Sequence, residues 1–380
     1  MGKRSQQSSQ FDRAAFAPAF ARRLCEWFAA AQRDLPWRRP ENARDAYRVL
    51  VSEVMLQQTT VAAVIPFYER FLARFPTLSS LAAASLEEVL PLWAGLGYYS
   101  RARHLHRLAQ AVMERHGGEF PRDLAEVTKL PGVGRYTAGA VTSIAFDAPS
   151  PIVDANVARV FSRLFLIEGD LKSGANQKRL WHEAAEQVQS GACPPSQLNP
   201  ALMELGALIC TPRAPRCGEC PVNAFCAAFA AGRQSELPHA TPKRDTVEMR
   251  DACAFIERGG RVFLRQRPHE AKIWWRGMWE LPRVTARENE SLEAALRRLL
   301  CEEFGLEATV GVRLKTVEHG VTHHHITLAC FAVEVAGEPR GGQWFAWDEI
   351  ESLALPSAMR RLLAWLRKHG AAPPTQLTLL

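Results

Sequence analysis

The stretch Leu130–Arg135 (LPGVGR) decides the fold of the first two-thirds of the chain. Helical patterns flank it on both sides, Asp123 to Leu130 and Arg135 to Phe146, so the sequence predicts two helices joined by a short glycine-rich turn. Glycines let a backbone approach another group closely, and the free N–H groups that open the second helix favour an anion. A phosphate site and a plain packing corner between helices both fit this pattern.

Further helical patterns extend over residues 15–227, and proline and glycine separate them. The expected helices are Phe20–Ala31, Tyr47–Thr59, Val61–Phe75, Leu86–Leu92, Arg101–His116, Trp181–Val188 and Ala201–Cys210. Beyond a polar, proline-containing stretch the period changes to that of strands, at 252–256, 261–264, 327–335 and 344–347, with one helix at 292–304. We therefore expect a mostly helical domain at 1–231, a linker at 232–249, a smaller α+β domain at 250–367 and a tail at 368–380.

Composition narrows the class of protein. The 380 residues are 47% hydrophobic and carry a net charge of +7, mostly in the first 250 residues, which is a mild bias toward a nucleic-acid partner. No apolar run approaches the roughly 20 residues that cross a bilayer. The polar start Met1–Gln10 has no apolar segment of a secretory signal. We expect a cytoplasmic protein that does not associate with membranes.

Four of the nine cysteines are clustered, with the spacing C-x6-C-x2-C-x5-C. The loop between them has too few large apolar residues to form a core, so we expect a metal to hold it. Structural zinc and an iron–sulfur cluster both take four cysteines, and spacing alone does not separate them. The cluster consists of Cys210, Cys217, Cys220 and Cys226. The other five cysteines (25, 193, 253, 301 and 330) are scattered, and we interpret them as small buried hydrophobic residues rather than disulfide partners.

Two carboxylates stand out. Glu53 lies among apolar residues, where burial raises the pKa of a carboxyl group and lets it donate a proton near neutral pH. Alternatively, Glu53 is exposed beside Ser52 on the polar face of its helix. Asp154 follows an apolar run and precedes a helical pattern, so it is expected to cap that helix, which is compatible with a chemical role.

Together these motifs resemble the MutY family of adenine DNA glycosylases, within the endonuclease III-like helix-hairpin-helix superfamily. The resemblance covers residues 18–230 strongly and 250–367 weakly. The matching runs are Leu35–Arg38 (LPWR), Ser52–Thr59 (SEVMLQQT), Gly95–Tyr99 (GLGYY), Leu130–Arg135, Val153–Val157 (VDANV) and the cysteine spacing. The resemblance implies a [4Fe–4S] cluster rather than zinc, and a helix-hairpin-helix glycosylase domain.

The resemblance also implies a chemistry. Bifunctional relatives carry a nucleophilic lysine two residues after the last glycine of the hairpin, where this chain has Tyr136, so a monofunctional hydrolysis is expected. Glu53 would protonate the leaving adenine and Asp154 would stabilise the positive sugar, with Tyr136 and Asn156 supporting them. The implied DNA and base contacts are Trp37, Arg38, Gln57, Gln58, Tyr98, Gly132, Val133, Gly134, Arg213 and Arg216. For Tyr98, ordinary core packing is the alternative.

One position departs from the family. Relatives often carry Gln or Glu where this chain has Pro200, which puts a purine contact in doubt. Glu204, one turn later, is a candidate substitute.

Residues 250–367 resemble the Nudix-related domain with which such enzymes read 8-oxoguanine opposite adenine. Arg298 and the run 302–306 match the end of the Nudix box, but Leu299 and Val284 replace its glutamate and glycine, which disfavours a true hydrolase. The family's Phe-Ser-His loop corresponds to Val321-Thr322-His323, so we expect Thr322 and His323 to contact the lesion. We interpret the nearby histidines (319, 323, 324 and 325) as a surface loop near DNA rather than a metal site.

The expected function is the removal of adenine mispaired with 8-oxoguanine or guanine from double-stranded DNA, by a monomer that is nucleoid-associated if the protein is bacterial. A glycosylase with another mismatch preference, such as thymine opposite guanine, is the alternative enzyme. An iron–sulfur DNA-binding module without catalysis is the alternative outside the enzymes.

Overall fold

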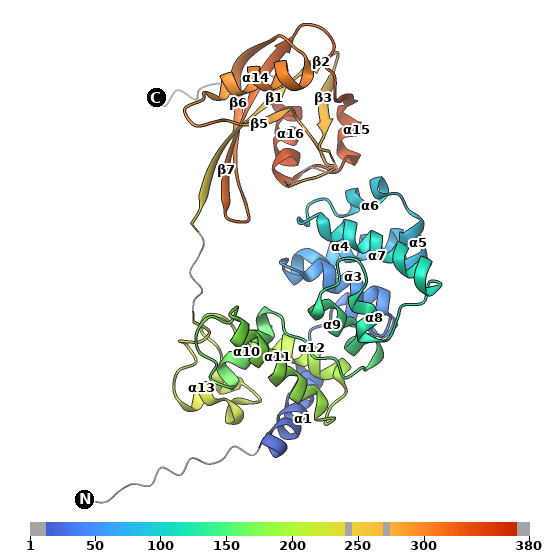
Figure 1. Cartoon of the computed structure of the whole chain (residues 1–380), viewed down its shortest axis with the longest axis vertical. Helices are drawn as coiled ribbons and strands as arrows, with labels where there is room; N and C mark the ends of the chain where they lie inside the picture. The colour runs from blue at the N-terminus through green and yellow to red at the C-terminus, as the bar shows by residue number, and fades with distance from the viewer. Residues whose placement is uncertain (1–12, 240–244, 269–273, 371–380) are drawn as a thin grey trace, which may run out of the picture. The chain divides into compact units, whose positions relative to one another are not determined.

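The computed structural model describes residues 13–239, 245–268 and 274–370. It has two compact units: unit 1 combines Met1–Ala84 with Arg103–Pro242, and unit 2 combines Ser85–Ala102 with Lys243–Leu380 (Figure 1). Within unit 2, the hydroxyl of Tyr99 donates a hydrogen bond to the carbonyl of Leu355 at 3.1 Å. In the described ranges, none of the helices combines the length and apolar character needed to cross a bilayer.

Unit 1 is helical. Polar side chains begin several of its helices: Asp45, Thr60 and Ser173, for example, each accept a hydrogen bond from a backbone N–H of the first turn. The helices are α1 (Arg13–Ala31), α2 (Pro40–Ala43), α3 (Ala46–Leu56), α4 (Val61–Arg74), α5 (Leu78–Ala83), α7 (Ser100–His116, which starts in unit 2), α8 (Leu124–Thr128), α9 (Arg135–Phe146), α10 (Ala155–Leu164), α11 (Gly174–Gln189), α12 (Pro195–Leu208) and α13 (Ala227–Ala230), with 3-10 turns η1 (Pro36–Arg38), η2 (Cys217–Glu219) and η3 (Asn223–Phe225). The helix α6 (Leu86–Leu92) belongs to unit 2.

The glycine-rich turn joins α8 to α9 as the sequence predicts. Asp123 caps α8 by accepting hydrogen bonds from two backbone N–H groups, and Gly134 is the N-cap of α9. Gly132 has φ +75°, and a Cβ atom there would lie 2.4 Å from the Cβ atom of His104. The turn therefore needs glycine at 132 for its backbone conformation and for its close contact with α7.

The core of unit 1 is apolar and joins α1, α9, α10, α11 and α12. Phe20, Leu24 and Phe161 are fully buried in it. Several expected helix limits were wrong, among them the start of α1, which begins at Arg13 and not at Phe20. The helix α3 ends at Leu56, because Gln58 already has φ +57°, and α11 begins at Gly174, seven residues before the expected start. The helix α12 begins at Pro195 and contains Pro200, whose missing N–H leaves no hydrogen bond to the preceding turn.

Unit 2 contains two four-stranded sheets, one in the order β5-β1-β7-β6 and one in which β3 pairs with β2, β4 and β8. The strands are β1 (Val247–Phe255), β2 (Glu257–Arg258), β3 (Arg261–Gln266), β4 (Trp279–Glu280), β5 (Arg283–Thr285), β6 (Ala308–Val321), β7 (His324–Val335) and β8 (Gln343–Ala346); the helices that follow β5 are α14 (Leu292–Phe304), α15 (Trp347–Ser352) and α16 (Ser357–His369). The strand β1 begins inside the stretch expected to be linker. The short strands β2, β4 and β5, the long strand β6 and the helices α15 and α16 were not predicted from the sequence.

Alternate residues of β1 serve two separate cores. Ala252 and Ala254 face α14, whereas Cys253 and Phe255 face α16, so each face of the sheet is covered by a helix (Figure 1). The strand β6 pairs with β7 up to Val321 opposite His324, which leaves a turn of two residues, Thr322 and His323.

Two interpretations of the scattered cysteines were wrong. Cys25 of α1 and Cys193, just before α12, form a disulfide, although 168 residues separate them in the chain. Cys301 is exposed on α14. Cys253 and Cys330 are buried opposite each other on β1 and β7, as interpreted.

Candidate active site

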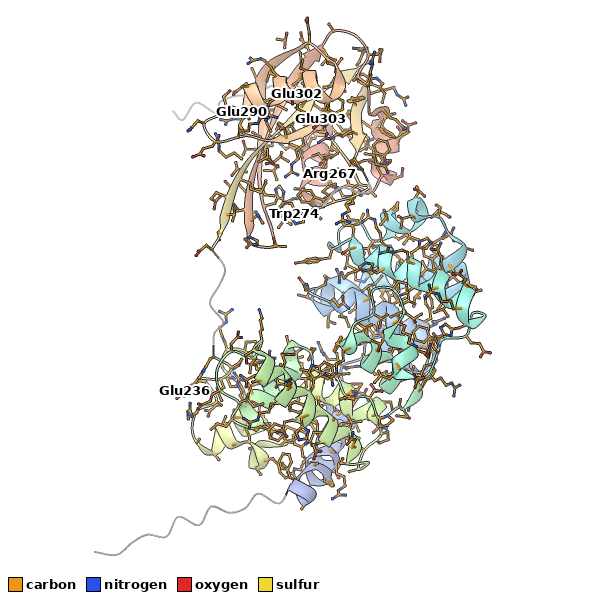
Figure 2. The ribbon with its side chains drawn as sticks, in the orientation of Figure 1. Glu236, Arg267, Trp274, Glu290, Glu302 and Glu303 are labelled. Atoms are coloured by element: carbon orange, nitrogen blue, oxygen red, sulfur yellow. A yellow bond between two sulfur atoms is a disulfide. The ribbon has the colours of Figure 1, made fainter. Side chains whose placement is uncertain are left out.

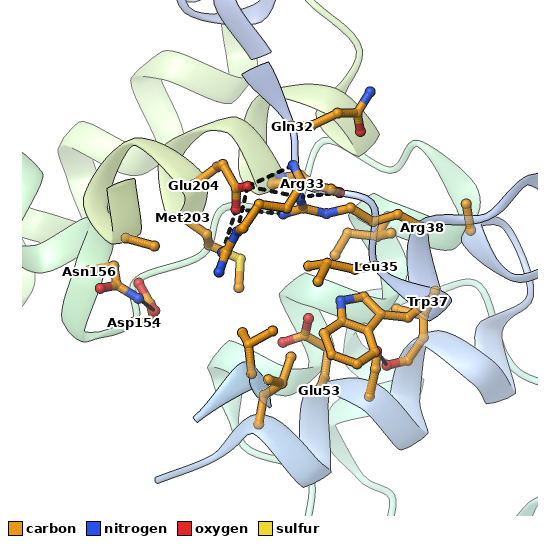
Figure 3. Close-up of a pocket in the computed structure, with 18 of the residues that line it drawn as sticks. Gln32, Arg33, Leu35, Trp37, Arg38, Glu53, Asp154, Asn156, Met203 and Glu204 are labelled. Atoms are coloured by element: carbon orange, nitrogen blue, oxygen red, sulfur yellow. Dashed lines mark hydrogen bonds and ion pairs between the residues drawn. The ribbon is translucent and has the colours of Figure 1, made fainter. Parts of the chain in front are cut away.

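A cavity of about 1030 Å³ lies in unit 1 between the end of α1, η1, α3, α9, α10 and α12 (Figure 3). Glu53, Tyr136, Asp154 and Asn156, which the sequence analysis placed in one site, all line it. Four of the expected DNA and base contacts line it too, namely Trp37, Arg38, Gln57 and Gln58.

Glu53 lies on α3 and is buried, with 5% of its surface exposed, so the alternative of an exposed polar face was wrong. The hydroxyl of Tyr136 donates a hydrogen bond of 2.6 Å to Glu53 Oε2. Burial raises the pKa of Glu53 to about 7, against the lowering effect of this hydrogen bond. Burial also raises the pKa of Tyr136 well above its ordinary value, so the phenol stays protonated. At neutral pH, Glu53 therefore holds a proton in a substantial fraction of molecules.

Asp154 lies on the opposite side of the cavity from Glu53 (Figure 3). It caps α10 by accepting a hydrogen bond from the backbone N–H of Val157 at 2.7 Å, as the sequence predicts. Its second oxygen accepts one from the side-chain amide of Asn156 at 2.9 Å. Burial raises the pKa of Asp154, although these hydrogen bonds oppose it by stabilising the carboxylate. The cavity thus contains one carboxyl group that readily keeps a proton and one that hydrogen bonds favour as an anion.

Arg159 connects Asp154 to the cysteine loop. This arginine is buried on α10 and donates hydrogen bonds to Asn156 Oδ1 at 2.9 Å and to the carbonyl of Cys210 at 2.7 Å. Gly206 permits this packing, because a Cβ atom there would lie 2.6 Å from the Cβ atom of Asn156. Arg159 was not predicted from the sequence, where the only signal was an arginine on the apolar face of a helix.

Glu204 of α12 is held between two arginines across the cavity (Figure 3). Its side chain is 1% exposed and accepts hydrogen bonds from the guanidinium groups of Arg33 at 2.7 and 2.8 Å and of Arg38 at 2.9 and 3.1 Å. The two guanidinium groups outweigh burial and lower the pKa of Glu204 to about 2. The two arginines thus occupy both oxygens of the Glu204 carboxylate and neutralise its negative charge.

This clamp predicts a loss of stability in Glu204→Ala. Removing one member of a buried ion pair leaves the other charges without compensation, so the free energy of unfolding at pH 7 should fall by about 3 kcal/mol. The stabilisation is present above the carboxyl's unfolded pKa of about 4.5 and lost as pH falls toward 2, because protonation removes the charge. Urea denaturation at pH 7 and pH 3 checks this, with a smaller difference at pH 3. An equal difference at both pH values would contradict it.

The four clustered cysteines form no disulfide and are partly buried in the loop of η2 and η3. Burial, and to a smaller extent the other three thiols of the cluster as anions, raise the pKa of Cys220 to about 12, so the thiols lie close together. Arg163, 2% exposed, directs a guanidinium N–H at Cys210 Sγ at 3.3 Å and donates to the carbonyl of Thr211. These features fit four thiolates bound to a positive group.

The donor set also bears on the kind of metal site. In the described ranges, no three His, Cys, Asp or Glu side chains are arranged to hold a single metal ion. A four-iron cluster takes one thiolate per iron and does not require such a group. Arg163 was not predicted from the sequence either, since its only local feature is its place four residues after Arg159 on α10.

Other expected contacts lie outside the cavity. Tyr98 is 49% exposed with φ +48°, so the alternative of core packing was wrong. The guanidinium of Arg101 lies 5.5 Å from the centre of its ring. Arg213 is exposed, whereas Arg216 forms an ion pair of 2.8 Å with Glu219 and also holds the carbonyl of Leu208.

The Nudix-like box of unit 2 retains part of its framework. Arg298 and Glu290 form an ion pair at 2.8 Å, while Leu299 is buried in the core beneath the sheet. Glu302 and Glu303 lie exposed on α14 (Figure 2), and Glu303 forms an ion pair with Arg265. A carboxylate is thus missing at 299, and a cation neutralises another at 303.

Comparisons with known proteins agree with this architecture. Residues 51–186 match the HhH-GPD superfamily of base excision DNA repair proteins, 252–365 match the NUDIX domain, and 210–226 match the iron–sulfur binding domain of endonuclease III. The adenine DNA glycosylase of Rattus norvegicus is 36% identical, over 92% of this chain and 78% of the rat protein. The adenine DNA glycosylase of Homo sapiens is also 36% identical, over 90% of this chain and 73% of the human protein.

Among solved structures, a thermostable thymine-DNA glycosylase matches with a TM-score of 0.50 and 32% identity, over 57% of this chain and 97% of that chain. Its match thus covers little more than half of this chain. The rat and human enzymes align over nearly the whole of it.

These matches confirm the expected fold class, a helix-hairpin-helix glycosylase domain followed by a Nudix-like α+β domain. They also confirm the expected cofactor, a [4Fe–4S] cluster in the loop 210–226, in place of zinc. The chain belongs to the MutY family of adenine DNA glycosylases.

Proposed function

We propose that this protein hydrolyses the N-glycosidic bond of adenine mispaired with 8-oxoguanine or guanine in double-stranded DNA. The observation that carries the proposal is the pair of carboxyl groups in one cavity, of which burial keeps Glu53 protonated near pH 7 while hydrogen bonds favour Asp154 as an anion. A cavity of about 1030 Å³ has room for a flipped nucleoside.

In this mechanism Glu53 donates its proton to a ring nitrogen of the leaving adenine. Because burial raises its pKa, Glu53 still holds this proton near neutral pH. Tyr136 orients the carboxyl group through its hydrogen bond. As the bond breaks, positive charge develops on the sugar, and Asp154 stabilises it electrostatically or through a transient covalent bond. Asn156 holds the Asp154 carboxylate in place. Glu53, which has given its own proton to adenine, then accepts a proton from the attacking water.

The reaction is expected to stop at an abasic site. Strand cleavage by glycosylases of this class needs an amine that forms a Schiff base with the sugar. Among the described residues that line the cavity there is no lysine, and the phenol of Tyr136 is engaged with Glu53.

The other expected roles remain part of the proposal. Residues 1–231 would carry out excision as a monomer, with the turn at Gly132, Val133 and Gly134 bound to phosphate and Tyr98 inserted into the duplex. Cys210, Cys217, Cys220 and Cys226 would hold the cluster, which fixes the loop that carries Arg213 and Arg216. Residues 250–367 would read the base opposite adenine through Thr322 and His323.

The pH dependence of the reaction follows from Glu53. A general acid must be protonated, so the single-turnover rate of adenine release should fall as pH rises through about 7 and approach a tenfold loss per pH unit. Measurements from pH 5.5 to pH 9 with an 8-oxoguanine:adenine duplex check this. A rate that stays flat up to pH 9 would exclude Glu53 as the acid.

Removal of thymine opposite guanine is the second candidate, favoured by the likeness to a thymine-DNA glycosylase structure. A panel of duplexes separates the two, with adenine opposite 8-oxoguanine, guanine and cytosine, and thymine opposite guanine. We expect adenine release from the first two and little from the others. Thymine release with no adenine release would favour the second candidate.

A further inference from the structure

The tip of the β6–β7 hairpin is conformationally strained. Its turn has only two residues, and the first, Thr322, has φ +56°. Two-residue turns of this kind favour glycine or asparagine, and a β-branched residue with positive φ is a rare outlier. Strain of this kind persists only where neighbouring groups hold the backbone in place, and it concentrates at binding sites.

Histidine rings hold the tip from one side. The hydroxyl of Thr322 donates to the carbonyl of Val321 at 2.6 Å, and its oxygen lies 3.3 Å from Nδ1 of His324 and 3.5 Å from Nδ1 of His323. The ring of His324 is also 4.1 Å from that of His323. The Thr322 oxygen thus lies between the carbonyl of Val321 and two histidine rings, of which His324 makes the shorter contact.

Trp274, which precedes β4, fixes His324 from the other side. The two ring centres are 4.9 Å apart with the rings at 67°, an edge-to-face contact. Trp274 also contacts the ring of Trp275 at 5.7 Å (Figure 2 labels Trp274 and Arg267). The base of the hairpin tip, at His324, therefore packs against the aromatic pair Trp274 and Trp275, which precedes β4.

That aromatic pair is anchored to the core of unit 2. The ring of Trp275 contacts two guanidinium groups, Arg283 at 4.7 Å and Arg267 at 5.5 Å. Each arginine is paired with a buried carboxylate, Arg283 with Asp251 at 2.6 Å and Arg267 with Glu280 at 2.7 Å. A continuous series of contacts thus runs from buried ion pairs through two tryptophans to the hairpin tip.

We propose that Trp274 is a positioning residue for lesion recognition: it holds His324, and through it Thr322, so that the hairpin tip presents a fixed hydroxyl and the His323 ring to the base opposite adenine. This inference rests on the proposed function.

The test compares Trp274→Ala, Trp274→Phe and a matched control, Trp365→Ala, which removes another tryptophan–histidine stack (Trp365 with His369, 4.5 Å) in the same unit. The measured quantity is the ratio of single-turnover adenine release from 8-oxoguanine:adenine and guanine:adenine duplexes. We expect the ratio to fall about tenfold in Trp274→Ala, to be largely kept in Trp274→Phe and to be unchanged in the control. A Trp274→Ala protein that keeps the full ratio would overturn the inference.

A second variant separates recognition from folding. Thr322→Gly removes the strain and the hydroxyl together, so it should melt at or above the temperature of the unchanged protein and yet lose preference for 8-oxoguanine. A variant that keeps the preference would contradict the role of the tip. Failure of the unchanged protein to release adenine from either duplex would instead contradict the proposed function, so the two failures are distinguishable.

Discussion

Glu53→Gln should abolish adenine release while leaving duplex binding intact. The glutamine amide has nearly the same shape and still accepts the hydrogen bond from Tyr136, but it has no acidic proton to donate. Loss of a positioned general acid slows a reaction by about 10²–10⁴-fold, and we expect an effect of this size here. Single-turnover excision and gel-shift affinity with an 8-oxoguanine:adenine duplex measure the two effects.

The same substitution should stabilise the protein above pH 7. In the unfolded chain Glu53 ionises near its ordinary pKa of 4.5, whereas the folded protein keeps the proton until about 7, so folding loses free energy as pH rises between these values. Glutamine has no such loss, and the free energy of unfolding at pH 8 should rise by up to about 3 kcal/mol. Glu183→Gln, a second buried glutamate outside the cavity, is the control.

Wild-type excision by Glu53→Gln would show that the acid is another group.

Asp154→Asn should slow adenine release by about 10²–10³-fold without unfolding the protein. Asparagine caps helices as well as aspartate does, so α10 should still begin at the same residue. The variant loses the negative charge that the positive sugar needs, together with one of the two acceptor oxygens that now bind Val157 and Asn156. Removal of one such electrostatic partner costs rates of this size. Rates at saturating protein, with circular dichroism melting, give both quantities.

The matched control is Asp123→Asn. Asp123 caps α8 in the same way but lies outside the cavity, so this change should leave the rate unaltered. Equal rates for Asp154→Asn and the unchanged protein would remove Asp154 from the mechanism.

The parts of the site that belong to a local sequence motif were predictable. The hairpin turn, the cysteine spacing and the cap at Asp154 all depend on residues within a few positions of each other, and the helices around them follow from apolar periodicity. Glu53 was recognisable as unusual because its neighbours are apolar, but the same pattern permitted an exposed position. Its burial depends on the packing of α3 against α9 and other elements distant in sequence, which the local pattern does not show.

Pairings across long stretches of chain were not predictable. Arg33 and Glu204 are 171 residues apart, and nothing near either residue indicates the other. The disulfide between Cys25 and Cys193 was unpredictable for the same reason, because 168 residues separate the two cysteines. The strand β6 was missed because it lies at the edge of its sheet with many exposed residues, so its apolar alternation is weak.

The central claim is that a buried carboxylic acid removes adenine and leaves the strand intact. The most direct test incubates the protein with an 8-oxoguanine:adenine duplex, identifies the released base by mass spectrometry and examines the strand before and after alkali. We expect free adenine and a strand that breaks only after alkali. Strand breakage without alkali, or release of a base other than adenine, would contradict the claim.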